Sequence, residues 1–223
     1  MTREERHQSA RDATRRAILD AALALFLENG YDHVSMRNIA ARIEYSPAAI
    51  YGYFASKDEI FYALAEEGYR RLGAMQLTAA ASDDPLDDVR NAAWRLYAFS
   101  KEQPQYFALV FLESRVPRIG RDFERFPIML EMKRRLHAQM ERCIAAGVFP
   151  AALNPQVAVR LLCAPIFGIA ALRLSQRIPD DEPADALARD AIDTTVAGLR
   201  VWTPRHSDPF TDPVADAAMS SAS

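Results

Sequence analysis

The chain has 223 residues, of which 50% are hydrophobic, and its 27 basic and 30 acidic side chains give a formal net charge of −3. That total excludes an argument for a polyanionic partner from overall charge, so any such argument depends on local placement. Only 8 residues are glycine and the prolines fall mostly between apolar-periodic segments, which favours an all-α fold over a β-sheet protein.

The first part of the chain predicts two helices separated by a short connection. Apolar side chains recur at helical spacing from Ile18 to Phe26 and predict a helix that begins at about Asp12 and ends at Gly30. Ser35 is suited to cap a second helix of about two turns. Residues 1–11 are polar and mixed in charge, and we interpret them as a flexible arm.

A third, short helix and a long fourth helix follow the interruption at Glu44-Tyr45. Ser46-Pro47 is typical of an N-cap followed by proline at the first helical position, where its missing N–H costs nothing. Ile50 and Phe54 lie four apart and are expected to face inward. Ser56 and Glu59 predict a capping box for the fourth helix.

Two short helices behind a longer one form the helix-turn-helix unit, whose second short helix enters the major groove of DNA. The stretches that carry the pattern are SMRNIA at 35–40, SPAAIYGYF at 46–54 and SK at 56–57. In order and spacing they resemble the DNA-binding domain of the tetracycline-repressor (TetR) family from about Thr14 to Leu64. The family usually has glycine at the position of Glu44, so Glu44 either takes a left-handed conformation or bends the turn differently.

The resemblance implies which residues bind DNA. The planar guanidinium of arginine can donate two hydrogen bonds to the edge of a guanine base. Alanine can contact only the methyl group of thymine, or it allows the backbone to approach the bases closely. The tyrosine hydroxyl and the lysine ammonium are suited to phosphate oxygens. The implied base readers are Arg37, Ala48, Ala49 and Gly52, the implied phosphate contacts are Tyr51, Tyr53 and Lys57, and Ser35, Ser46 and Pro47 complete the DNA-binding set.

Three alternatives stay open for these residues. Tyr51 is either a phosphate contact or mainly a packing residue, and Arg37 is either a base reader or a solvated surface charge. The arginines of the leading segment, Arg3, Arg6 and Arg11, form either a minor-groove arm or a solubilising tail.

Five more helices are expected beyond the polar junction at 80–85, which makes nine in all, the number that the resemblance implies. Their predicted ranges are Leu86 to Glu102, Pro104 to Ser114, Phe123 to Ala146, Pro155 to Arg177 and Glu182 to Thr203. We expect a DNA-binding domain at 12–60, a helical ligand-binding and dimerisation domain at 61–203, and a flexible tail at 204–223.

The second domain is rich in large apolar side chains, most of which are expected to form the core. Collectively they also suit a ligand cavity among helices. The candidate cavity residues are Trp94, Phe99, Tyr106, Phe107, Phe111, Met129, Met132 and Phe167, and the candidate polar anchors are Arg95, Tyr106, Glu113, His137 and Arg173.

The last two helices are apolar or rich in small residues over wide faces, and two of them from each subunit can form a four-helix interface. The predicted interface residues are Leu161, Gly168, Leu172, Leu187, Ala191, Thr195 and Leu199. A two-fold dimer is also what two DNA half-sites require.

The resemblance therefore implies a ligand-responsive transcriptional regulator. Such a homodimer binds a palindromic double-stranded DNA operator and releases it when a small, largely apolar effector binds the second domain. The alternatives are an activator, or a helical sensor or scaffold that does not bind DNA.

Other classes of protein have little support in the sequence. The chain has no nucleophile elbow, no phosphate-binding glycine loop and no paired histidines at metal-ligand spacing, so we expect no enzyme, cofactor or metal site. The apolar run Leu161 to Leu172 is shorter than the about 20 residues that span a bilayer and is interpreted as a buried helix. With no secretory signal, we expect a cytoplasmic protein in which Cys143 and Cys163 are packed thiols.

Overall fold

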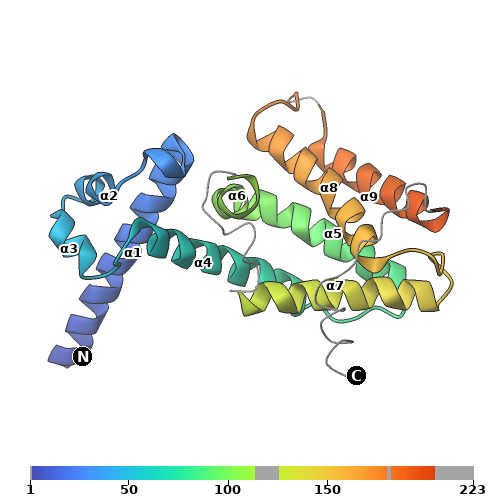
Figure 1. Ribbon diagram of the computed structural model, residues 1–223, viewed down its shortest axis with the longest axis horizontal. Coiled ribbons are helices and arrows are strands. Elements are labelled where there is room, and N and C mark those ends of the chain that lie inside the picture. The colour runs from blue at the N-terminus through green and yellow to red at the C-terminus, as the bar shows by residue number, and fades with distance from the viewer. Residues whose placement is uncertain (1, 114–125, 180–181, 204–223) are drawn as a thin grey trace, which may run out of the picture.

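The computed structural model describes residues 2–113, 126–179 and 182–203, and within these ranges the chain forms nine α-helices and no strand (Figure 1). The helices are α1 Arg3–Asn29, α2 Met36–Arg42, α3 Pro47–Tyr51, α4 Lys57–Leu77, α5 Pro85–Glu102, α6 Pro104–Phe107, α7 Pro127–Ala145, α8 Pro155–Leu174 and α9 Ala184–Arg200. A 3-10 turn, η1 Tyr31–His33, follows α1, and a π-helical turn, η2 Ala108–Leu112, follows α6. The predicted all-α fold is confirmed.

The first helix is longer than the sequence pattern predicted. It begins at Arg3 instead of Asp12, because Thr2 accepts a hydrogen bond from the Glu5 N–H while the Glu5 carboxylate accepts one from the Thr2 N–H. Residues 3–11, which the sequence suggested to be a flexible arm, are therefore helical, and the predicted start of the helix at Asp12 is wrong. These turns have no buried face, which is why apolar periodicity did not reveal them.

The helix-turn-helix unit is built around a compact apolar core. Ile18, Ile39, Ile50 and Phe61 are almost completely buried where α1, α2, α3 and α4 meet. The rings of Phe26, Tyr31 and Phe61 lie 5.4 to 5.6 Å apart between centroids and fix the end of α1 against α4. The short α2 and α3, too short to be stable alone, are held by this packing.

The long helix α4 links the two halves of the molecule, as Figure 1 shows. Ser56 caps it by accepting from the Glu59 N–H, but the Glu59 carboxylate accepts from the Ala55 N–H, so only half of the predicted capping box forms. The predicted domain boundary at 60/61 falls within the first turn of this continuous helix.

The second half is a bundle in which α5 contacts α4, α7, α8 and α9. The predicted helix from Pro104 to Ser114 is divided into α6 and the π-helical turn η2. Both cysteines are free thiols, as expected, and burial raises the pKa of each to about 11. The predicted helix start at Phe123 and the predicted tail at 204–223 lie outside the described residues.

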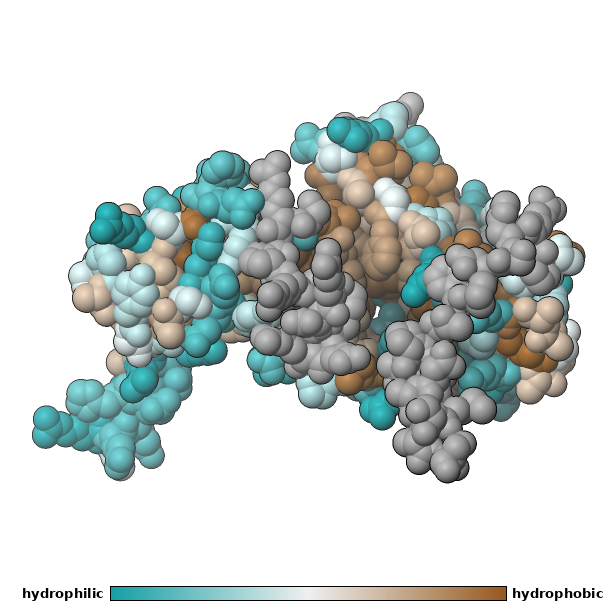
Figure 2. Space-filling view, in the orientation of Figure 1, coloured by the Kyte–Doolittle hydropathy of each residue, from teal (hydrophilic) through white to brown (hydrophobic). Residues whose placement is uncertain are grey.

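Helix α8 is buried on one side only, which corrects its interpretation as a buried helix. It has 20 residues with a mean hydropathy of 1.9, and by length and composition alone it is apolar enough to cross a membrane. Leu162, Ile166 and Ala170 pack inward, whereas Leu161 and Leu172 are 43% and 41% exposed. A helix that is apolar on all sides is normally buried on all sides, so the outer face of α8 is an exposed apolar surface. Figure 2 shows hydrophobic surface, coloured brown, over α8.

Candidate nucleic-acid interface

A Schellman motif closes the turn between α2 and α3. The Tyr45 N–H donates to the Ala40 carbonyl at 2.9 Å and the Glu44 N–H donates to the Ala41 carbonyl at 3.3 Å, which are the two bonds of this motif. Glu44 has a φ of 59°, so of the two alternatives the left-handed conformation is observed. The turn keeps regular hydrogen bonding, and its cost is the strain of a side chain in the left-handed region, about 1 kcal/mol.

Helix α3 presents small side chains to solvent. Ser46 accepts from the Ala49 N–H at 3.2 Å and Pro47 occupies the first turn, as the sequence predicted. Ala48 and Gly52 are exposed and Ala49 is half-buried, so these three positions carry no long side chain that would hold the backbone away from the floor of a DNA groove. This arrangement fits the base-reading role expected of these positions.

Arg37 is the second residue of α2 and lies in the first turn of that helix. Its helix begins with a reciprocal pair of bonds: the Asn38 N–H donates to Ser35 Oγ at 3.2 Å, and the Ser35 N–H donates to Asn38 Oδ1 at 2.9 Å. Arg37 is exposed and makes no ion pair with any residue that the structure describes. Its guanidinium is therefore available to a ligand.

The three expected phosphate contacts differ in their surroundings. Tyr51 is 56% exposed, which argues against a packing role. Tyr53 is half-buried on the core. The Lys57 ammonium donates to the Tyr31 carbonyl at 2.8 Å and lies 4.0 Å from the centroid of the Tyr31 ring. Lys57 therefore positions the α1–α2 connection as well, a role that sequence reasoning missed.

The helical start of α1 adds two basic residues beside α3. The Arg11 guanidinium lies 5.8 Å from the centroid of the Tyr53 ring, and that of Arg15 lies 5.0 Å from the Phe54 ring. Sequence reasoning left Arg15 out, although its spacing of four from Arg11 is the signal that both share a helix face. The first turns of α1 project from the domain as a hydrophilic extension (Figure 2).

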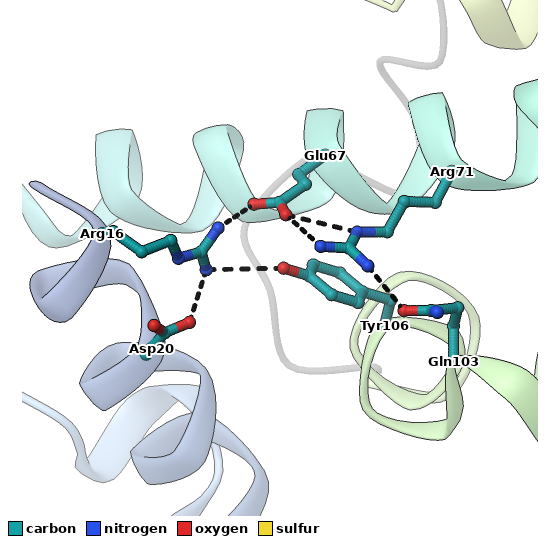
Figure 3. A network of polar contacts seen from close by, with 6 residues as sticks. All are labelled: Arg16, Asp20, Glu67, Arg71, Gln103 and Tyr106. Carbon is teal, nitrogen blue, oxygen red and sulfur yellow. Dashed lines mark hydrogen bonds and ion pairs between the residues drawn. The ribbon is translucent and has the colours of Figure 1, made fainter. Parts of the chain in front are cut away.

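A network of charged side chains joins this domain to the second one (Figure 3). The Glu67 carboxylate on α4 accepts from Arg16 on α1 at 2.6 Å and from Arg71 at 2.6 Å. Arg16 also donates to the Tyr106 hydroxyl on α6 at 3.5 Å and pairs with Asp20 at 2.7 Å. Burial alone raises the pKa of Glu67, but the bonds from Arg71 and Arg16 outweigh it and lower that pKa to about 2.

Directly beside this network, side chains of α6 and η2 pack closely against the backbone of α4 at Gly68. A Cβ at Gly68 would lie 3.1 Å from Val110 and 3.2 Å from Tyr106, closer than ordinary packing allows. Tyr106 belongs to the charged network, whereas Val110, four residues later, lines a cavity in the second domain. The charged network and the cavity therefore both adjoin the consecutive elements α6 and η2, which pack against α4.

That cavity, of about 1200 Å³, lies among α4, α5, η2, α7 and α8. Four of the eight predicted ligand residues line it: Phe111, Met129, Met132 and Phe167. The other four do not, because Phe99 and Phe107 are fully buried in the adjoining core, Trp94 lies 3.8 Å from the Arg189 guanidinium, and Tyr106 is at the junction. Among the candidate anchors, Glu113 and His137 line the cavity, while Arg95 and Arg173 do not.

The predicted interface residues fall into three groups. Leu161, Gly168 and Leu172 are exposed on the outer face of α8, and Leu187, Ala191 and Thr195 are half-buried on α9. Leu199 is 2% exposed and shares the inner face of α9 with Ile192 and Val196. A partner cannot contact Leu199, so its assignment is wrong.

Comparison with known proteins identifies the helix-turn-helix domain. Residues 18–64 match the profile of the family described as "Bacterial regulatory proteins, tetR family". The chain is 42% identical over 71 residues to the HTH-type transcriptional repressor Rv1474c of Mycobacterium tuberculosis, an alignment that covers 32% of this chain and 36% of that repressor. Residues 18–64 therefore form a DNA-binding domain of the TetR type.

Two further likenesses extend beyond the TetR-type DNA-binding domain. The uncharacterized HTH-type transcriptional regulator YdeS of Bacillus subtilis is 26% identical over 200 residues, which cover 88% of this chain and 94% of YdeS. The crystal structure of a regulatory protein in the tetR family from Rhodococcus RHA1 superposes with a TM-score of 0.67 at 18% identity, covering 85% of this chain and 98% of that one. The chain therefore has the two-part fold of that structure, with an N-terminal helix-turn-helix domain followed by a helical bundle.

Proposed function

We propose that this protein is a homodimeric, ligand-responsive repressor of the TetR type that binds a palindromic operator. The single observation that carries the proposal is the row of small residues Ala48, Ala49 and Gly52 on α3, which a regularly hydrogen-bonded turn places next to the exposed Arg37. One short recognition helix reads only a few base pairs, so a specific site needs two copies of it about one DNA turn, 34–36 Å, apart.

The outer face of α8 supports the dimer. It offers Leu161, Gly168 and Leu172 at spacings of seven and four, which lie on one side of a helix, and α9 adds Ala191 and Thr195 beside it. Two such helix pairs can close a two-fold, four-helix interface. The protein acts where its DNA is, in the cytoplasm.

The cavity and the junction suggest how a ligand would release DNA. A ligand against Val110 and Phe111 displaces η2 and α6, and these press on α4 at Gly68. Movement there strains the Arg16–Glu67–Tyr106 contacts that hold α1 to the second domain. The two DNA-binding domains then no longer fit one operator.

Fluorescence anisotropy on DNA from upstream of the protein's own gene tests the DNA-binding part. We expect tight binding that weakens steeply with salt, and Arg37→Ala should lower affinity and relax specificity at one base pair of each half-site. Arg70→Ala is the matched control, because Arg70 is an exposed arginine on α4 outside the helix-turn-helix. Equal specificity profiles for the wild type and Arg37→Ala would remove Arg37 from the reading role.

Calorimetry with and without operator tests the release. Coupling between two sites is reciprocal, so a ligand that releases DNA must bind more weakly to the DNA complex by the same factor. Unchanged ligand affinity in the presence of operator would contradict the repressor scheme.

A further inference from the structure

We propose that the cavity in the second domain takes an amphipathic anion, a molecule with a long hydrocarbon body and one anionic head group. This inference rests on the proposed function, since it names the effector class of the same regulator. Three properties of the cavity carry it: its volume, its apolar wall and the sign of the charges around it.

The wall is built for a hydrocarbon chain. Leucine, valine, phenylalanine and methionine side chains from five helical elements form it, among them Leu72, Val110, Phe111, Met132 and Phe167. At about 1200 Å³ the cavity exceeds the roughly 300–1,000 Å³ of ordinary small-molecule pockets. The two methionines at 129 and 132 have flexible, polarizable side chains that adapt to ligand shape. A long, flexible apolar body fits this space better than a small rigid ring.

The charges around the cavity are mostly positive. Among the residues that the structure describes, Lys133, Arg134 and Arg135 of α7 and Arg160 of α8 line it, and Glu113 is the one carboxylate. Arg134 is paired with Glu131 on its own helix, so it contributes little net charge. Lys133 and Arg135 alone still give more positive charge than the Glu113 carboxylate gives negative charge among the described lining residues, which favours an anionic ligand.

Arg135 is the cation best placed to act inside the wall. It is half-buried and donates to two neutral acceptors, the carbonyl oxygens of Leu77 and Ala79 at the end of α4. Neither acceptor is a carboxylate, so the guanidinium charge is not cancelled by an ion pair. The nearby Arg95 donates to the side-chain oxygen of Gln76, another cavity residue, and burial followed by the charge of Arg135 lowers the pKa of Arg95.

The occupant follows from combining these properties. A hydrocarbon chain with a cationic head group would be repelled by Lys133 and Arg135, and a neutral chain would gain binding free energy only from its contacts with the apolar wall. A carboxylate-bearing chain gains from both, because its head group can reach Lys133 or Arg135 while its body lies on Phe111, Met132 and Phe167.

Three probes with the same dodecyl chain separate the contributions: dodecanoate, dodecanol and dodecyltrimethylammonium, each titrated below its micelle concentration into the full-length protein by calorimetry. We expect dodecanoate to bind at least about tenfold more tightly than dodecanol, and the ammonium compound to bind most weakly. The preference for dodecanoate over dodecanol should shrink as salt is added. Equal affinities for the three probes, or a preference for the cation, would overturn the proposal.

Two variants assign the head group and the body. Lys133→Gln should weaken dodecanoate about three- to tenfold and leave dodecanol unchanged, whereas Phe167→Ala should weaken both probes. Arg70→Gln, which removes the same charge outside the cavity, should change neither. Equal weakening of both probes by Lys133→Gln would contradict a head-group role for this rim of the cavity.

The anisotropy assay on the upstream DNA separates this inference from the proposed function. Tight dodecanoate binding by a protein that ignores DNA would refute the repressor and support the anion site. Operator binding by a protein that does not prefer dodecanoate would refute the anion site alone.

Discussion

Replacing Glu67 by glutamine removes the negative charge that lies between Arg16 and Arg71 while keeping the size and shape of the side chain. The carboxylate is 16% exposed and accepts from both arginines at 2.6 Å. Without it, two guanidinium groups lie close together at the junction, and Arg16 keeps Asp20 as its acidic partner and the Tyr106 hydroxyl as a hydrogen-bond acceptor. The variant should therefore lower the free energy of unfolding and loosen α1 from α4.

The size of the loss follows from the pKa of Glu67. A fall from its ordinary 4.5 to about 2 corresponds to roughly 3 kcal/mol at neutral pH. The side chains of Arg16 and Arg71 are 39% and 43% exposed, so solvent screening reduces that value. We expect a loss of about 1–2 kcal/mol at pH 7, which lowers the melting temperature by about 2–8 °C.

The pH dependence gives the sharper test. A carboxylate with a lowered pKa in the folded state stabilises the protein above its unfolded pKa, and that contribution disappears as the pH falls toward the folded value. The difference in free energy of unfolding between wild type and Glu67→Gln should be constant above about pH 5.5 and shrink between 4.5 and 2. Urea titrations at pH 7, 5, 4 and 3.5 measure it. Glu66→Gln, an exposed neighbour on α4, is the control; an equal loss for it, or a loss that does not change with pH, would refute the reasoning.

Three further predictions concern single side chains. Glu44→Gly should relieve the left-handed strain at φ 59° and raise the free energy of unfolding by about 0.5–1 kcal/mol, seen as a higher urea midpoint at unchanged slope; a lower midpoint would contradict the turn geometry. Lys57→Ala should cost about 1 kcal/mol of stability through the lost bond to Tyr31, and it should weaken binding to every DNA sequence and lower the salt slope by about 1. Leu172→Glu should convert the dimer to a monomer in analytical ultracentrifugation, while Leu27→Glu, the same change at the equally exposed Leu27 of the DNA-binding domain, should not.

The helix-turn-helix could be predicted from the sequence because its signals are local. The caps at Ser35 and Ser46, the proline at 47 and the glycine at 30 each act within one turn of helix, and all four lie where expected. The start of α1 was missed because residues 3–11 bury nothing, so a capping box alone marks them.

The cavity and the junction could be predicted only in part, since both depend on how distant helices pack. Phe99, Phe107 and Phe111 look alike in sequence, yet Phe111 alone of the three lines the cavity, because Phe99 and Phe107 are fully buried while Phe111 is only partly buried at the edge of the core. The Arg16–Glu67–Tyr106 network joins residues 39 to 90 positions apart, and no periodicity links them. Leu199 was assigned to the wrong face of α9 for the same reason.

Sedimentation of the purified protein with a fluorescent duplex from upstream of its gene tests the central claim most directly. The account predicts a dimer without DNA, and a complex of two chains on one duplex that forms at low ionic strength and dissociates as salt is added. A strictly monomeric protein, or one that leaves every duplex unbound at low salt, would contradict it.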